Sequence, residues 1–333
     1  MSGPVKPVGV ALSGQQLAAL LGDRGLVARL DAGPLAFAVT GIDRIDGATT
    51  PAGPTVESTI AAATLAALAP RLGWLAAAAV HRDHPYNLAR RVASLDHVSD
   101  GRAGLLLGLS DGYAPSGREG HEVWGGAGLT EGVPIGIDTT ADAAAAIQAL
   151  WHSWPAAAIV ADRDTGVYAR SEEIVHVDHR GVFDIDGPLT VPTTAQGAPV
   201  LAWRATTLPE AARARRVAEV LLWPLDAART LDDVAAAPGT AALFAEVAAS
   251  DPELDARVAA LLADDRVVGV VLRPDPSPDA LAALLADGAG GWRSAAAAAV
   301  PGSGTLRERL GLPSPAPRPA GGRPAFPPSP PER

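Results

Sequence analysis

The sequence predicts a (β/α)8 barrel, in which eight parallel strands alternate with helices around a closed sheet. Short apolar runs of strand length alternate with segments of helical composition along most of the chain. That alternation favours parallel strands joined by helical crossovers. Eight runs qualify as strands, and 333 residues with 48% hydrophobic content suit one barrel at least as well as two smaller domains.

In the opening stretch, each predicted strand is followed by a predicted helix. Ser13 follows the first apolar run and is available to cap the first helix. A Gly-, Pro- and Thr-rich loop is expected at residues 47–54. The predicted strands cover residues 8–12, 35–40 and 72–80, and the predicted helices cover residues 15–30 and 56–68.

The next unit is a helix, a tight turn and a fourth strand. Leu88, Val92 and Leu95 recur at helical spacing and give the segment one apolar face. The Ser-Asp-Gly sequence at 99–101 ends the helix, and residues 103–109 form the short apolar run of a strand that is buried on both faces.

The second half supplies the remaining strands. Residues 111–132 are rich in Gly, Ser and charge, so they predict a loop at the carboxyl end of the fourth strand, which is the functional face of a barrel. Helices are expected at 141–154 and 208–219, and strands at 200–203, 220–223, 241–247 and 267–272.

Charge and composition exclude several classes of protein. A net charge of −10 with 27 scattered Lys and Arg residues argues against nucleic-acid binding. The absence of cysteine excludes disulfides, thiolate zinc sites and a cysteine nucleophile. There is no signal peptide and no apolar stretch long enough to span a bilayer, so a soluble cytoplasmic protein is expected.

A possible metal site is formed by His176, Asp178 and His179, which have the spacing of metal ligands. A structural loop is the favoured interpretation, and no metal site is predicted.

Three segments carry a resemblance to a known family. They are PYNLARRVASLDHVSDGRAG at 85–104, VHVDHRGVFDIDGPLTVPTTAQGAPV at 175–200 and TLRERLGLPSPAPRP at 305–319. The chain resembles the flavin-dependent monooxygenases of the bacterial luciferase-like superfamily, particularly the nitrilotriacetate and dibenzothiophene-sulfone monooxygenase branch. The resemblance runs from about residue 35 to residue 319 and implies a luciferase-like barrel domain at 1–312. A Pro- and Gly-rich tail at 313–333 is then expected to be disordered or wrapped on the surface.

The resemblance also implies an activity and partners. Members of this branch use reduced FMN, supplied by a separate flavin reductase, together with oxygen to oxidise a small organic substrate. The chemistry belongs to the cofactor, and the protein provides orientation and a dry pocket. The barrels of the family usually pair, so a homodimer or a heterodimer with a related chain is expected.

A cofactor site follows from the same resemblance. Ala205, Thr206 and Thr207 align with a Gly-Ser-Ser turn that the family places at a helix N-terminus, where hydroxyls and free N–H groups favour a phosphate. Arg204 is expected to add positive charge, and Ser110 is the retained polar residue at the end of the fourth strand. The alternative is that Thr206 or Thr207 merely caps the helix.

Two histidines are the catalytic candidates. His81 and His84 follow the third predicted strand, where either can act as a general base or bond a flavin edge. The equally weighted alternative is a pair of solvated loop histidines.

Other family positions have lost their polar groups. Ala79 and Val80 stand where the family usually has hydroxyl residues that contact the flavin, and Leu106 stands in place of an Asn. The family's His and Tyr before the 141–154 helix fall near Val133 and Ile137. These losses favour a second hypothesis, a non-catalytic barrel that acts as the companion subunit of an active paralogue.

Overall fold

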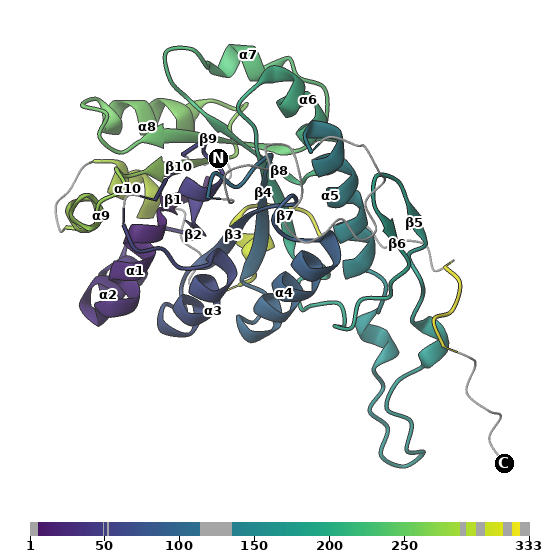
Figure 1. The fold of residues 1–333 in the computed structure, drawn as a ribbon. Coiled ribbons are helices and arrows are strands. Elements are labelled where there is room, and N and C mark those ends of the chain that lie inside the picture. The colour runs from purple at the N-terminus through teal and green to yellow at the C-terminus, as the bar shows by residue number, and fades with distance from the viewer. Residues whose placement is uncertain are drawn as a thin grey trace.

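The computed structural model describes residues 6–48, 50–51, 53–113, 135–286, 291–297, 304–315 and 322–326. Its eight parallel strands close into a barrel in the order β1-β10-β9-β8-β7-β4-β3-β2 (Figure 1). The strands are β1 (Val8–Leu12), β2 (Phe37–Thr40), β3 (Gly73–Ala79), β4 (Ala103–Gly108), β7 (Val200–Arg204), β8 (Val220–Pro224), β9 (Ala242–Ala248) and β10 (Gly269–Arg273). The predicted (β/α)8 barrel and all eight of its strands are therefore confirmed.

Helices lie around the barrel, apart from the short last one, which lies at its amino-terminal end. They are α1 (Gly14–Gly22), α2 (Arg24–Ala32), α3 (Ser58–Leu68), α4 (Pro85–Val98), α5 (Ile137–Trp151), α6 (Leu208–Val217), α7 (Leu231–Ala235), α8 (Leu254–Ala263), α9 (Pro278–Leu285), α10 (Trp292–Ala297) and α11 (Leu306–Arg309). Three short 3-10 helices are also present, η1 (Ile42–Arg44), η2 (Ala156–Ala158) and η3 (Ser171–Glu173). In the part of the chain that the structure describes, no helix combines the length and apolar character needed to cross a membrane.

The single helix predicted at 15–30 is wrong, because the chain forms two helices there. Asp23 lies between them with extended backbone angles, and its carboxylate accepts hydrogen bonds from the N–H groups of Gly25 and Leu26. An aspartate in this position satisfies the free N–H groups of a new helix, which favours a break over continuation. Ser13 caps α1 as predicted, in a capping box with Gln16.

Buried polar contacts hold the helix-turn-strand unit of α4 and β4 together. The Asp96 carboxylate accepts hydrogen bonds from the Ala103 N–H at 2.8 Å and from the Gln196 side-chain amide at 2.8 Å. Arg102 donates to carbonyl groups near the end of α3, those of Ala66, Ala69 and Leu72. The motif at 85–104 therefore fixes the turn into β4 and joins it to the neighbouring helix.

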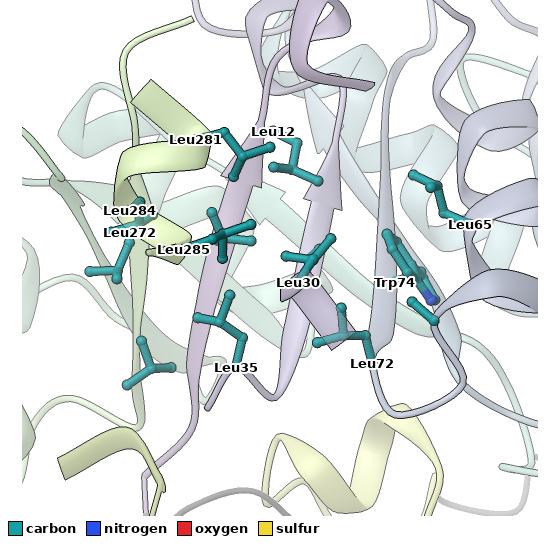
Figure 2. Packing of buried hydrophobic residues seen from close by; sticks show 14 of the residues in the cluster. Leu12, Leu30, Leu35, Leu65, Leu72, Trp74, Leu272, Leu281, Leu284 and Leu285 are labelled. Atoms are coloured by element: carbon teal, nitrogen blue, oxygen red, sulfur yellow. The ribbon is translucent and has the colours of Figure 1, made fainter. Parts of the chain in front are cut away.

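Two apolar regions fill the fold. One lies between the strands and the surrounding helices, where leucines from β1, α2 and α9 belong to the same buried cluster as Trp74 of β3 (Figure 2). The other lies inside the barrel, where the Phe37 and Phe244 rings meet edge to face with centroids 5.9 Å apart. The interior of the barrel is therefore filled by packed side chains along its axis, as is usual in this fold.

The short helix α11 closes the amino-terminal end of the barrel. Leu306 and Leu310 are fully buried within the barrel's apolar interior. A Cβ added to Gly73 or Gly104 would lie within 3.1 Å of a Leu306 methyl group, so these two glycines at the strand starts leave the room that Leu306 occupies. The C-terminal family motif thus supplies a plug for the barrel.

A long excursion separates α5 from β7. It contains the antiparallel pair β5 (His179–Arg180) and β6 (Asp184–Ile185), which Figure 1 shows outside the barrel, beyond α5. Tail residues 322–326 lie along this excursion, because the His176 N–H donates to the Arg323 carbonyl and the Ala325 N–H donates to the Ile174 carbonyl. The division into a barrel domain at 1–312 and a disordered or surface-wrapped tail at 313–333 stays a prediction.

Candidate functional site

The carboxyl ends of β2, β3 and β4 bring three ionisable side chains together. Arg44 lies in η1, just after β2, and its guanidinium donates to the Asp111 carboxylate from Nε at 3.0 Å and from Nη2 at 2.6 Å. The Asp111 N–H points at the His81 imidazole, 3.2 Å from Nε2. All three residues are less than 9% exposed. Both Arg44 donors bond the same Asp111 oxygen, Oδ2, and this ion pair, with His81 beside it, fixes the loops after β2 and β4 to each other.

A tyrosine extends the same cluster. The Tyr113 hydroxyl donates to the Asp43 carboxylate at 2.6 Å, and the other oxygen of Asp43 accepts from the Gly14 N–H at 2.9 Å. Burial and this hydrogen bond to a carboxylate raise the pKa of Tyr113. The phenol is therefore protonated at neutral pH and serves as a donor.

Of this cluster, only His81 was a predicted site residue. The available signal for three of the others was their position, since Asp43 and Arg44 lie a few residues after the predicted strand at 35–40 and Asp111 lies just after the one at 103–109. Polar residues at the carboxyl ends of barrel strands meet at one face.

His81 is buried, and that burial lowers its pKa despite the nearby charge of Asp111. The imidazole is therefore neutral at pH 7.

We expect His81→Gln to flatten the pH dependence of stability between about pH 7 and pH 5, because the unfolded chain binds a proton there more readily than the folded chain. The wild-type free energy of unfolding should fall as the pH drops through 6.5, the ordinary histidine value. Urea denaturation at three pH values measures both slopes, and equal slopes would remove His81 as the cause.

His84 has a structural role in this arrangement. It is the N-cap of α4, where its Nδ1 accepts a hydrogen bond from the Tyr86 N–H at 3.2 Å. Its ring also meets the Phe183 ring edge to face, with centroids 5.8 Å apart. Ser110 is exposed and directly precedes Asp111. The structure therefore places His81 in the buried cluster at the strand ends and His84 at the N-cap of α4.

Arg204 belongs to a second buried ionic group at the end of β7. Its Nε and Nη2 donate to the two carboxylate oxygens of Glu246 at 2.7 and 2.9 Å, and both side chains are 3% exposed. Arg273 contacts the same carboxylate at 3.3 Å and also pairs with Asp46. Burial alone would lower the pKa of Arg204 and raise that of Glu246, but their mutual hydrogen bonds and charges reverse both shifts. The positive charge predicted to help a phosphate is therefore compensated within the chain.

The predicted phosphate cradle lies where expected, at the start of α6, but a carboxylate occupies it. Glu210 is 1% exposed, and its Oε2 accepts from the Thr206 N–H at 2.8 Å and from the Thr206 hydroxyl at 3.3 Å. Its Oε1 accepts from the Trp203 indole N–H at 2.9 Å. Thr207 is the N-cap of α6, and its hydroxyl accepts from the Glu210 N–H. Ala205 is buried beside them.

These donors do not fit an FMN phosphate as they are arranged. The Thr206 N–H and hydroxyl already bond an anion, and Thr207 has the capping role that was the alternative interpretation.

Along the barrel axis the apolar side chains leave a cavity of only about 10 Å³, which is at the lower limit for a single water molecule.

A larger cavity lies at the edge of the barrel face that is formed by the carboxyl ends of the strands. It has a volume of about 780 Å³ and is lined by the loops after β9 and β10 together with α8 and α9. None of the predicted site residues lines it. Within the described ranges, no three His, Asp or Glu side chains are grouped to hold a metal ion.

Comparison with curated proteins finds relatives along much of the chain. It is 32% identical over 266 residues to a pristinamycin IIA synthase subunit of Streptomyces pristinaespiralis, a match that covers 78% of each protein. It is 34% identical over 163 residues to nitrilotriacetate monooxygenase component A of Aminobacter aminovorans. It is also 32% identical over 151 residues to dibenzothiophene-sulfone monooxygenase of Rhodococcus erythropolis. The last two matches cover 48% and 44% of this chain and 34% and 31% of those relatives, so the chain spans about a third of their length.

Solved structures share the fold. EDTA monooxygenase from Chelativorans sp. BNC1 superimposes with a TM-score of 0.67 at 18% identity, over 93% of this chain and 99% of that one. Riboflavin lyase, solved with a modified FMN and riboflavin, also gives 0.67, at 20% identity over 93% and 96% of the two chains. No protein-family model matches the sequence.

Proposed function

Because the chain belongs to the luciferase-like family of flavin-dependent monooxygenases, we propose that it works in a monooxygenase reaction. The reaction uses reduced FMN from a separate reductase, together with oxygen, to oxidise a small organic substrate. The observation that carries the proposal is the 32% identity to a synthase subunit over 78% of both chains. The nitrilotriacetate and dibenzothiophene-sulfone enzymes, both named monooxygenases, support the reaction class.

Two roles in that reaction are compatible with the fold. In the first, the chain binds FMN itself, and the flavin when bound supplies the oxygen chemistry. The residues of the chain would then orient the flavin and exclude water, with neutral His81 and Tyr113 as the hydrogen-bonding groups at the strand ends. The substrate enters from the face formed by the loops after the strands.

In the second role, the chain is the companion subunit of a related barrel that holds the flavin. A specific observation favours this role, because the predicted phosphate donors at Thr206 already bond Glu210 and the Arg204 charge is paired with Glu246. The relative that matches 78% of this chain is named as one subunit of a synthase, which agrees with an assembly of unlike chains. We propose the companion role for this chain, within a heterodimer.

The two roles predict different behaviour of the purified chain. For a companion subunit, calorimetry with oxidised and with anaerobically reduced FMN gives no saturable heat up to about a millimolar concentration. Coexpression with a luciferase-like paralogue from the same genome should then give a 1:1 complex in sedimentation, and the complex should bind reduced FMN.

Each failure of this test has a distinct meaning. Saturable micromolar binding of FMN by the chain alone would overturn the companion role and leave the first role in place. If no paralogue forms a complex and FMN binds nowhere, the proposed monooxygenase function fails.

A further inference from the structure

We infer that Glu210 is a built-in replacement for a bound phosphate, so that the chain closes its own anion site at the start of α6 (Leu208–Val217). The inference deepens the proposed function and rests on it, because it explains why a family member would need a partner to hold the flavin phosphate. It also makes a separate prediction, that removal of a single charge opens the site.

The Glu210 carboxylate lies beside the start of α6, where its three donors come from Trp203 and Thr206, just before the N-cap Thr207. The first N–H groups of a helix lack partners within the helix, and the helix dipole places partial positive charge there. Glu210 accepts from the Thr206 N–H, from the Thr206 hydroxyl and from the Trp203 indole N–H. A backbone amide, a hydroxyl and an indole N–H that converge on one buried anion are also donors that suit a phosphate.

An ordinary capping box does not account for this contact. Two such boxes use a carboxylate, at Thr230 with Asp233 and at Thr305 with Glu308, and in each the carboxylate accepts from the N–H of the N-cap residue itself. Both of those carboxylate residues are exposed. Thr207 and Glu210 have the same spacing, yet the Glu210 carboxylate bonds the residue before the cap and is almost completely buried.

Burial makes the replacement effective. A phosphate can reach the Thr206 donors only if it displaces a carboxylate that already has three hydrogen bonds. Two anions cannot share the site, because like charges at close range in a buried setting repel strongly. The wild-type chain is therefore closed to phosphate at this helix start.

Glu210→Gln is the direct test. The glutamine keeps an amide oxygen for the Trp203 N–H, but its NH2 group cannot accept from Thr206, so the Thr206 donors become available. Inorganic phosphate and FMN are titrated separately, and the Thr206 amide resonance is followed by NMR. We expect no saturable shift in the wild type and a saturable shift in the variant, with affinity at least tenfold higher.

Two further variants make the result specific. Glu308→Gln has the same Thr-x-x-Glu spacing at an exposed capping box, and it should gain no phosphate binding. Thr206→Ala combined with Glu210→Gln should lose most of the gained affinity, because the hydroxyl donor is gone. Glu210→Ala serves if the glutamine variant does not fold, and thermal melts establish that each variant is folded.

Two outcomes overturn the inference. The first is a wild-type Thr206 amide that shifts saturably with phosphate, a result that decides the question even if neither variant folds. The second is a folded Glu210→Gln protein that gains no binding. Neither outcome affects the coexpression test of the monooxygenase function, so the two proposals can fail independently.

Discussion

Replacing Arg204 with methionine should lower the free energy of unfolding by about 3 kcal/mol, because it leaves Glu246 as a buried, partly compensated charge. Both side chains of the pair are 3% exposed, and the guanidinium makes two hydrogen bonds to the carboxylate. Arg273 retains one contact to Glu246, which places the loss at the lower end of the range for a broken buried pair. Urea denaturation at pH 7 measures it.

The pH dependence adds a second test of the same pair. In the wild type, the charge of Arg204 helps to hold the pKa of Glu246 below its ordinary value, so the stability from Glu246 is present at neutral pH and is lost as the pH falls through that lowered pKa. Without Arg204, burial should raise the pKa of Glu246. The stability gap between wild type and variant should then narrow as the pH is lowered from 7 toward 4.

A matched control separates burial from pairing. Arg266 pairs with Asp232 and Asp264 on the surface, where its side chain is 45% exposed. Arg266→Met should therefore cost much less than Arg204→Met, because surface ion pairs contribute little to stability. Equal losses in the two variants would contradict the argument.

The barrel could be predicted from the sequence because its strands are apolar on both faces and short. All eight apolar runs became strands, with boundaries that differ by a few residues at most. The prediction of one helix at 15–30 was wrong because of a local interaction: Asp23 caps the start of a second helix. Helices α7 to α11 are absent from the prediction, which named only the apolar strands in that part of the chain.

The candidate site could be placed on the fold but not described in detail. The helix start at Thr206 and Thr207 was predicted, yet the group that occupies its donors depends on how the Glu210 side chain folds back, which spacing alone does not determine. Arg204 was predicted to add positive charge at the phosphate site. A signal for its partner was present in Glu246, an acidic residue within a predicted apolar strand, because a buried charge needs a counter-ion.

Leu306→Ala should also have a large effect, about 2–5 kcal/mol of lost stability, which is the usual cost of truncating a fully buried leucine. Leu306 is 0% exposed and belongs to the apolar cluster inside the barrel, at its amino-terminal end. Its backbone N–H bonds the Gly101 carbonyl at 2.8 Å, and Arg307 beside it pairs with Glu219, so α11 cannot readily shift to refill the space. Thermal and urea unfolding of the full-length variant provide the measurement.

A chain that ends after Leu312 is the informative comparison. It keeps α11 and the whole plug. Among the described residues it loses the Pro313 carbonyl that accepts from Arg307, the two backbone hydrogen bonds between the tail and residues 174–176, and one exposed ion pair. These bonds lie at the surface, where water replaces a lost partner, and the truncation removes no buried side chain of the barrel's apolar interior. The truncation should therefore cost less than the single substitution. If the truncated chain were the less stable of the two, the tail would be the main C-terminal support of the barrel, and Leu306 would not be its plug.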